Sequence, residues 1–140
     1  MSSEDARRAW SAMSQLVLAE DRRASVTHEL GLSFARVRAL RRLLKAPLTL
    51  RELGALLGAD PPYTTVLVDD LQERGLVRRT PHPDDRRRKL VHLTDRGRAA
   101  AERAKAILDE PPKALTDLPT RDAATLRRLL EQLASVDAPG

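Results

Sequence analysis

The chain has 140 residues, 41% hydrophobic and 32% charged, a composition that fits one folded domain and excludes a disordered chain. The formal net charge is +5 and 21 of the 25 basic residues are arginine, which favours a polyanionic partner. The absence of cysteine excludes disulfides and cysteine metal sites, and the absence of a signal-peptide core or a long apolar run predicts a cytoplasmic protein.

The N-terminal third of the chain predicts two helices. The first is expected from about Glu4 to Ala24, with apolar residues at helical spacing: Ala9, Trp10, Met13, Leu16 and Val17. A turn is expected at residues 30–32. Ser33 is a good N-cap for a second helix that runs to Lys45 and ends before Pro47.

The next segment predicts two short helices separated by a tight turn. Thr49 and Glu52 have the spacing of a capping box, in which each side chain bonds the other residue's backbone N–H. The residues of this helix expected to face inward are Leu50, Leu53, Leu56 and Leu57. Gly58 ends the helix, and Asp60 caps another that is predicted over residues 61–74.

Residues 74–94 predict two strands joined by a polar, highly charged tip. The strands are expected at Leu76–Thr80 and Lys89–Leu93. Seven basic side chains lie between Arg74 and Lys89. Because apolar strands flank them, they predict a folded arm that presents arginines to an anion, such as the phosphate backbone of DNA, rather than a disordered tail.

The C-terminal third predicts two more helices. One runs from Thr94 and Asp95 to about Asp109, and the second begins at about Thr120 after a pair of prolines. The second helix carries an apolar stripe of Leu126, Leu129, Leu130, Leu133 and Val136. The predicted order is α-α-α-α-β-β-α-α, which is a mainly α fold.

Two short helices joined by a tight turn have the form of a helix-turn-helix, whose second helix enters the major groove of DNA. The candidates for base contacts are Pro62, Tyr63, Thr64 and Thr65, with Asp69 as a further candidate. For Tyr63 the alternative is packing on Leu67. The following strand pair would form a wing that reaches the DNA backbone or the minor groove, where arginine is attracted.

Two motifs carry a resemblance to a known family. The first is Asp85-Arg86-Arg87 followed by Val91, Leu93 and Thr94, and the second is Leu71 followed by Gly75, Leu76 and Val77. With them, residues 48–97 resemble the MarR family of winged helix-turn-helix repressors. The resemblance implies a single MarR-type domain, with a winged core at about 33–94 and dimerisation helices at about 4–24 and 95–137.

The resemblance also implies a function and residue roles. We expect a homodimeric repressor that binds a pseudo-palindromic operator in double-stranded DNA and is released by a small aromatic or phenolic effector. Arg87 would enter the minor groove, and Asp85 would pair with a nearby arginine and hold the tip in shape. Arg86 and Arg88 would contact the backbone, although they also fit a solvated basic edge. The other arginines expected near DNA are Arg36, Arg51 and Arg79.

The chain departs from the family pattern in the helix at residues 61–74. Val66 and Asp70 stand where the family often has basic residues, and the helix has no basic residue before Arg74. Base recognition would then rest on the tyrosine and threonines or on bridging water. We therefore expect the wing to supply more of the affinity, and less of the sequence preference, than the helix beside it.

The family resemblance implies an effector pocket between the dimerising helices and the winged module. The candidates by position are Trp10, Met13, His28, Phe34 and Arg38. The alternative is that Trp10, Met13 and Phe34 are ordinary core residues and that His28 is an exposed loop residue.

The sequence argues against an enzyme. The three histidines lack metal-ligand spacing, and there is no phosphate loop and no cysteine nucleophile. No cofactor is expected. The remaining alternative is a winged-helix module that binds protein without specific DNA binding. A salt titration separates the two, because DNA affinity falls steeply with salt.

Overall fold

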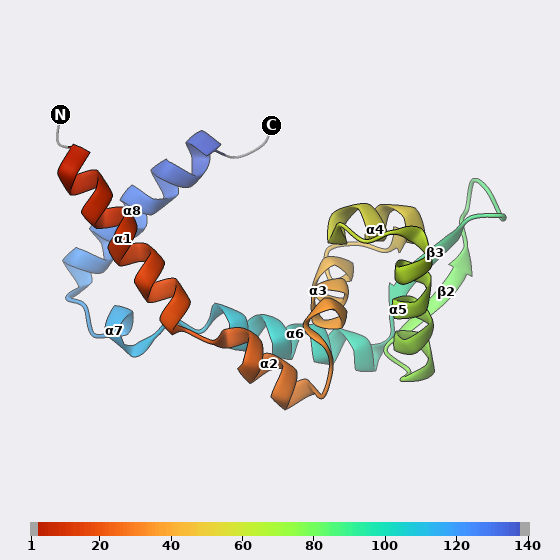
Figure 1. Ribbon diagram of the computed structural model, residues 1–140. Coiled ribbons are helices and arrows are strands. Elements are labelled where there is room, and N and C mark those ends of the chain that lie inside the picture. The colour runs from red at the N-terminus through yellow and green to blue at the C-terminus, as the bar shows by residue number, and fades with distance from the viewer. Residues whose placement is uncertain (1–2, 138–140) are drawn as a thin grey trace. The chain divides into compact units, whose positions relative to one another are not determined.

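The computed structural model describes residues 3–137 and divides the chain into two compact units, Met1–Asp109 and Glu110–Gly140. The helices of the first unit are α1 (Ser3–Ala19), α2 (Arg22–Leu30), α3 (Phe34–Leu43), α4 (Leu50–Leu57), α5 (Pro61–Glu73) and α6 (Asp95–Asp109) (Figure 1). Its strands are β1 (Leu48–Thr49), β2 (Val77–Pro81) and β3 (Lys89–Leu93). The second unit holds α7 (Lys113–Thr116) and α8 (Thr120–Asp137).

The strands form an antiparallel sheet with the order β1-β3-β2. The β2–β3 pair runs from Val77 opposite Leu93 to Pro81 opposite Lys89, and it extends into the charged tip (Figure 1). The short β1 strand, which the sequence analysis did not predict, pairs Leu48 with Val91. The predicted mainly α architecture with a winged helix-turn-helix is confirmed.

Helices α3, α4 and α5 begin where the sequence predicts, because their caps form. The Ser33 hydroxyl accepts a hydrogen bond from the Arg36 amide at 3.3 Å. Both bonds of the Thr49–Glu52 capping box are present, at 3.0 and 3.1 Å. The Asp60 carboxylate accepts a bond from the Tyr63 amide at 2.8 Å and so starts α5. These local bonds fix the ends of the two helices of the helix-turn-helix.

The hydrophobic core lies where α2, α3 and α6 meet the helix-turn-helix and the sheet. Its fully buried side chains include Val26, Val37, Leu40, Leu53, Leu67, Leu71 and Val91. Helix α6 contributes the small residues Ala101 and Ala104, both completely buried. A Cβ atom on Gly97 would lie 1.8 Å from the Leu76 carbonyl oxygen, so only glycine allows α6 to begin against this backbone.

The predicted first helix, over residues 4–24, is wrong because it is interrupted. Helix α1 ends at Ala19, and the Asp21 carboxylate caps α2 by accepting a bond from the Ala24 amide at 3.1 Å. His28 therefore lies on a helix, and it is exposed. The predicted turn at residues 30–32 marks the end of α2, where Gly31 adopts a φ of 64°.

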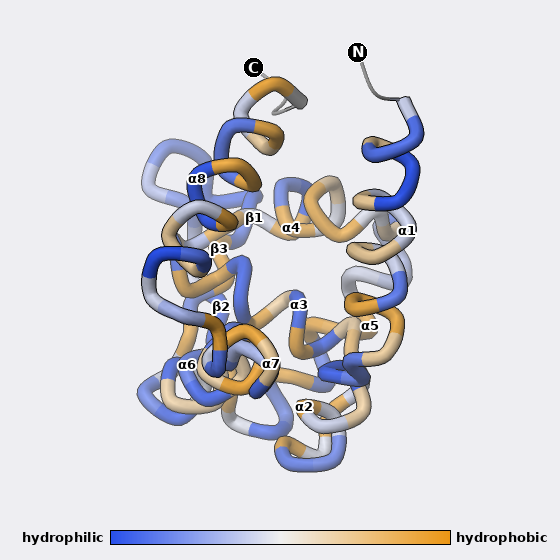
Figure 2. The backbone as a smooth tube through the Cα atoms, turned by 90° about the vertical axis from the view of Figure 1, so that its left-hand side faces the viewer, coloured by the Kyte–Doolittle hydropathy of each residue, from blue (hydrophilic) through white to orange (hydrophobic). Residues whose placement is uncertain are grey.

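Both outer helices present unpartnered apolar side chains, each within its own unit. Helix α1 has no buried residue among those described, and it exposes Trp10, Leu16, Val17 and Leu18. Helix α8 exposes Leu129, Leu130, Leu133 and Val136, and apolar positions alternate with polar ones along its tube in Figure 2. Between residues 3 and 137, no helix is long and apolar enough to cross a membrane.

Candidate nucleic-acid interface

Helix α5 packs closely on α4 through a glycine and a buried threonine. A Cβ atom on Gly54 would lie 2.8 Å from the Thr64 hydroxyl oxygen and 3.3 Å from the Ala59 carbonyl oxygen. Thr64 is only 1% exposed, and its hydroxyl donates to the Asp60 carbonyl at 2.9 Å. The prediction that Thr64 contacts a base is therefore wrong, because this side chain joins the two helices.

The opposite side of α5 is open to solvent. Its exposed residues include Pro62, Tyr63, Thr65, Val66 and Asp69. Tyr63 is 46% exposed, and it lines a pocket of about 270 Å³ together with Arg38, Asp60 and Leu67. Val66 is 58% exposed, so the position where the family often has a basic residue presents an isopropyl group instead. The open face of this helix carries hydroxyl, methyl and carboxylate groups.

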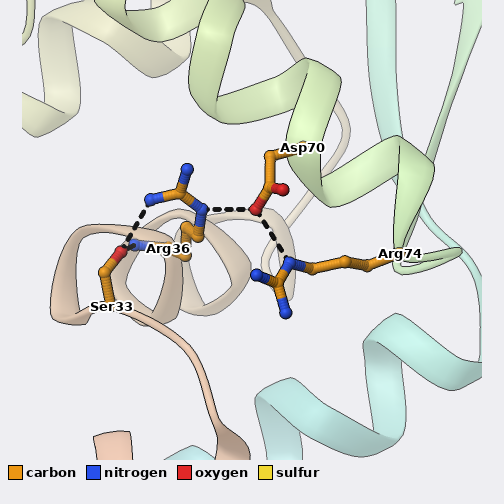
Figure 3. A network of polar contacts seen from close by, with 4 residues as sticks. All are labelled: Ser33, Arg36, Asp70 and Arg74. Carbon is orange, nitrogen blue, oxygen red and sulfur yellow. Dashed lines mark hydrogen bonds and ion pairs between the residues drawn. The ribbon is translucent and has the colours of Figure 1, made fainter.

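Figure 3 shows that the inner carboxylate of α5, Asp70, holds two arginines. The Nε atoms of Arg36 and Arg74 donate to the same Asp70 oxygen, at 2.6 and 2.8 Å. Arg36 also donates to the Ser33 hydroxyl at 2.9 Å. The Arg36 bond, followed by that from Arg74, lowers the pKa of Asp70 below its usual value. Arg36, which the sequence placed at the DNA backbone, instead ties α3 to α5.

The outer carboxylate of α5, Asp69, pairs with an arginine of the wing. Nη2 of Arg79, on β2, donates to the Asp69 carboxylate. The Arg79 side chain is only 23% exposed, and its buried Nε has no hydrogen-bond partner. Arg79 was expected near DNA, but here it packs beside α5. The two neighbouring aspartates thus bind three arginines, one each from α3, the C-cap of α5 and β2.

The wing tip, residues 82–88, is organised by one carboxylate. Asp85 Oδ1 accepts hydrogen bonds from the Arg87 amide at 3.0 Å and from Arg87 Nε at 3.3 Å. The Asp85 carbonyl accepts from the Arg88 amide at 3.0 Å, which closes a turn. The Arg87 side chain remains 93% exposed, and Arg86 and Arg88 are also exposed. The pairing expected of Asp85 is present, and it leaves the arginines facing solvent.

The histidine at the base of the wing, His92, adds little positive charge. The Thr80 hydroxyl and His92 Nε2 lie 2.7 Å apart across β2 and β3. Burial, helped by the nearby Arg78, lowers the pKa of His92 below its usual value. Because the neutral imidazole is favoured, the positive charge of the wing comes from its arginines and Lys89.

The candidate effector residues have different surroundings. Trp10 is 69% exposed on α1, where Met13 is half-buried. The Arg23 guanidinium lies over the Phe34 ring, 4.6 Å from its centroid, and His28 is exposed on α2. Arg38 lines the pocket beside Tyr63. These contacts do not gather the five residues into one site. Arg51, a further DNA candidate, is exposed on α4.

Comparison with known proteins identifies the winged core. A model of the MarR family matches residues 30–88, from the end of α2 to the wing tip. HTH-type transcriptional regulator BilQ of Clostridium symbiosum is 32% identical over 84 residues, which are 59% of this chain and 58% of that protein. The aligned region thus spans little more than half the length of this curated relative.

Two solved structures extend the similarity to the outer helices. A probable transcriptional regulator from Pseudomonas aeruginosa is 36% identical and covers 84% of this chain and 92% of its own, with a TM-score of 0.58. A MarR-family transcriptional regulator from Rhodococcus sp. RHA1 is 29% identical, with a TM-score of 0.63. The match covers 96% of this chain and 95% of the Rhodococcus chain. The MarR family consists of transcriptional regulators rather than enzymes, and this chain belongs to that family.

Proposed function

We propose that this protein regulates transcription by binding double-stranded DNA as a homodimer, and that it acts as a repressor. The wing tip carries the proposal, because Arg87 is 93% exposed while Asp85 holds its backbone and its Nε. An arginine that is both fixed and solvent-facing is ready to enter a minor groove without first giving up a buried partner. The neighbouring helix-turn-helix supplies the element for the major groove.

The outer helices support the dimer. Within the described residues the apolar rows of α1 and α8 stay exposed, and a second copy of the chain is the simplest way to bury them. Two-fold symmetry would place the two α5 helices roughly 34–36 Å apart, which is one turn of DNA, and would match a pseudo-palindromic operator.

A matched pair of variants tests the dimer. Leu130→Asp places a charge in the apolar row of α8, whereas Ser135→Asp places the same charge on the opposite face of the helix. We expect Leu130→Asp to halve the mass measured by light scattering and Ser135→Asp to leave it unchanged. Equal masses for the wild type and Leu130→Asp would count against this interface.

The proposal includes release from DNA by a small aromatic or phenolic effector, as the family resemblance implies. Trp10, Met13, His28, Phe34 and Arg38 stay the candidates by position. The cytoplasmic location also remains a prediction from the sequence.

Selection of bound sequences from a random duplex pool tests DNA binding directly. We expect enrichment of a two-fold-symmetric sequence, and affinity that falls with salt with a log–log slope of about −0.9 per phosphate contacted. A wing that binds protein instead of DNA would enrich no sequence. Binding that did not depend on salt would likewise refute the proposal.

A further inference from the structure

The open face of α5 carries a carboxylate at a position suited to reading DNA bases. Thr65 and Val66 lie four and three residues before Asp69, so both are its neighbours on the exposed side of the helix. Thr64, Leu67, Val68 and Leu71 are buried on the other face. A helix that enters the major groove with its open face would therefore bring Asp69 toward base edges.

The Asp69 side chain is held by one partner but is not covered by it. Arg79 donates from β2 to Asp69 Oδ1, and the arginine itself is largely packed away, with 23% of its side chain exposed. The Asp69 side chain is 58% exposed. Because a carboxylate can accept several hydrogen bonds, this single ion pair orients the group and leaves it acceptor capacity. Asp70 differs, because two arginines bind it between the helices.

We propose that Asp69, positioned by Arg79, selects cytosine at one position of each operator half-site. The inference rests on the proposed function, since it assumes that α5 enters the major groove. An ionised carboxylate only accepts hydrogen bonds, and the amino groups of cytosine and adenine are the donors in that groove. Guanine and thymine present acceptors, which repel the carboxylate. Adenine places its N7 acceptor beside its amino group, so cytosine is the better match.

The same carboxylate explains how this helix selects sequences without a cation of its own. A negative group near the phosphates weakens binding to every duplex, and only a correctly placed amino group compensates for this repulsion. Specificity then comes mainly from the rejection of wrong bases. The positive charge that holds the DNA is supplied by the wing tip instead.

The test is selection from a random duplex pool with the wild type, Asp69→Ala and Asp69→Asn. We expect the wild type to prefer cytosine over guanine at one position per half-site by roughly tenfold, the usual scale of one base contact. Asp69→Ala should lose this preference. Asp69→Asn should move it to adenine, because a carboxamide both donates to N7 and accepts from N6.

Two further variants test whether the cytosine preference depends on the net charge of α5 and on the positioning of Asp69 by Arg79. Glu73→Gln removes the same charge from an exposed position on the same helix, and it should leave the cytosine preference unchanged. Arg79→Gln should weaken the preference by several-fold while the protein stays folded and its binding to mixed-sequence duplex changes little. If Arg79→Gln kept the full preference, the positioning role of Arg79 would be refuted.

The outcomes distinguish this inference from the proposed function. If Asp69→Ala enriches the same sequences with the same cytosine preference as the wild type, Asp69 does not read a base, although the protein still binds DNA. If the wild type enriches no duplex at all, the proposed function fails and the inference fails with it.

Discussion

The wing tip and the recognition helix α5 both place aspartates beside arginines, with opposite results. At the wing tip one carboxylate, Asp85, fixes the backbone and leaves Arg87 93% exposed. At α5 the paired arginines are less accessible: the side chains of Arg36 and Arg79 are 22% and 23% exposed, and that of Arg74 is 47% exposed. The arginines of the wing are therefore available to an external anion, whereas those around α5 are used inside the protein.

This difference implies that the wing tip and α5 have different roles in DNA binding. Phosphate contacts supply most of the affinity and its salt dependence, whereas base contacts supply the sequence preference. The wing tip has the free cations needed for the first role. Helix α5 has an open face of hydroxyl, methyl and carboxylate groups, which suits the second role.

The largest expected effect comes from the packing under α5. Gly54→Val would place side-chain atoms where the Thr64 hydroxyl oxygen lies only 2.8 Å from an added Cβ, so α5 must move. We expect a loss of about 1–3 kcal/mol in the free energy of unfolding, measured by denaturant titration. Ala55→Val, an exposed change on the same helix, should cost less than about 0.5 kcal/mol. Equal denaturation midpoints for the two variants would show that α5 does not depend on this contact.

Arg87→Ala and Arg36→Ala test the comparison most directly. Arg87→Ala should lower DNA affinity about tenfold, or about 1.4 kcal/mol, and leave the melting temperature unchanged because the side chain touches little of the protein. Arg36→Ala should show the reverse pattern, because it removes a link between α3 and α5. DNA affinity and melting temperature, measured on both variants, show whether each arginine acts on DNA binding or on stability. A similar pattern in the two would remove the distinction between free and internally paired arginines.

Asp85→Ala should have a smaller effect on binding than Arg87→Ala. Without the carboxylate the tip loses the bonds to the Arg87 amide and Nε, while the arginine itself remains. We expect affinity to fall by about threefold, or less than 1 kcal/mol, in a fluorescence anisotropy titration. Asp84→Ala, which removes the same charge from the neighbouring position, provides the control. If Asp85→Ala bound more tightly than the control, repulsion of DNA would outweigh the organising role of Asp85.

The smallest expected effect is a pH dependence of the stability that Asp70 contributes. The bonds from Arg36 and Arg74 lower the pKa of Asp70 in the folded state, so its contribution to stability is present above the unfolded value of 3.8 and is lost as the pH falls through the folded value. Asp70→Asn should therefore lower the melting temperature more at about pH 6 than at about pH 3. If the melting temperatures of the wild type and Asp70→Asn differed by the same amount at both pH values, the ionised Asp70 would not stabilise the folded state.

Local patterns in the sequence were enough to predict where α3, α4 and α5 begin and to predict the wing. The caps at Ser33, Thr49 and Asp60 each involve residues three positions apart, and such bonds follow directly from spacing. The organising role of Asp85 was implied by the family resemblance, and its partner in the structure, Arg87, is two positions away. These features are local, so the sequence alone determines them.

The remaining features depend on contacts between distant residues. Arg36 and Asp70 are 34 positions apart, and nothing in the spacing indicates that they meet. Leu56 was expected to face inward but is 44% exposed, and Thr64 was expected to face DNA but is buried. Both errors arise because the rotation of a short helix about its axis is set by the element it packs against. The break after α1 was missed because Asp21 fits a polar helix position as well as a cap.

The joint between α5, the wing and α6 is stiff. The Thr94 hydroxyl donates to the Gly75 carbonyl at 2.6 Å and accepts from the Gly97 amide at 3.0 Å. Beside it, Gly97 lies against the Leu76 backbone with no room for a Cβ atom. These contacts join the end of α5, the wing and the start of α6 within a few residues. We therefore expect the first turn of α6 to keep its position against the wing when α6 rotates. We expect such a rotation to move the wing and the C-terminal end of α5 together as one rigid body.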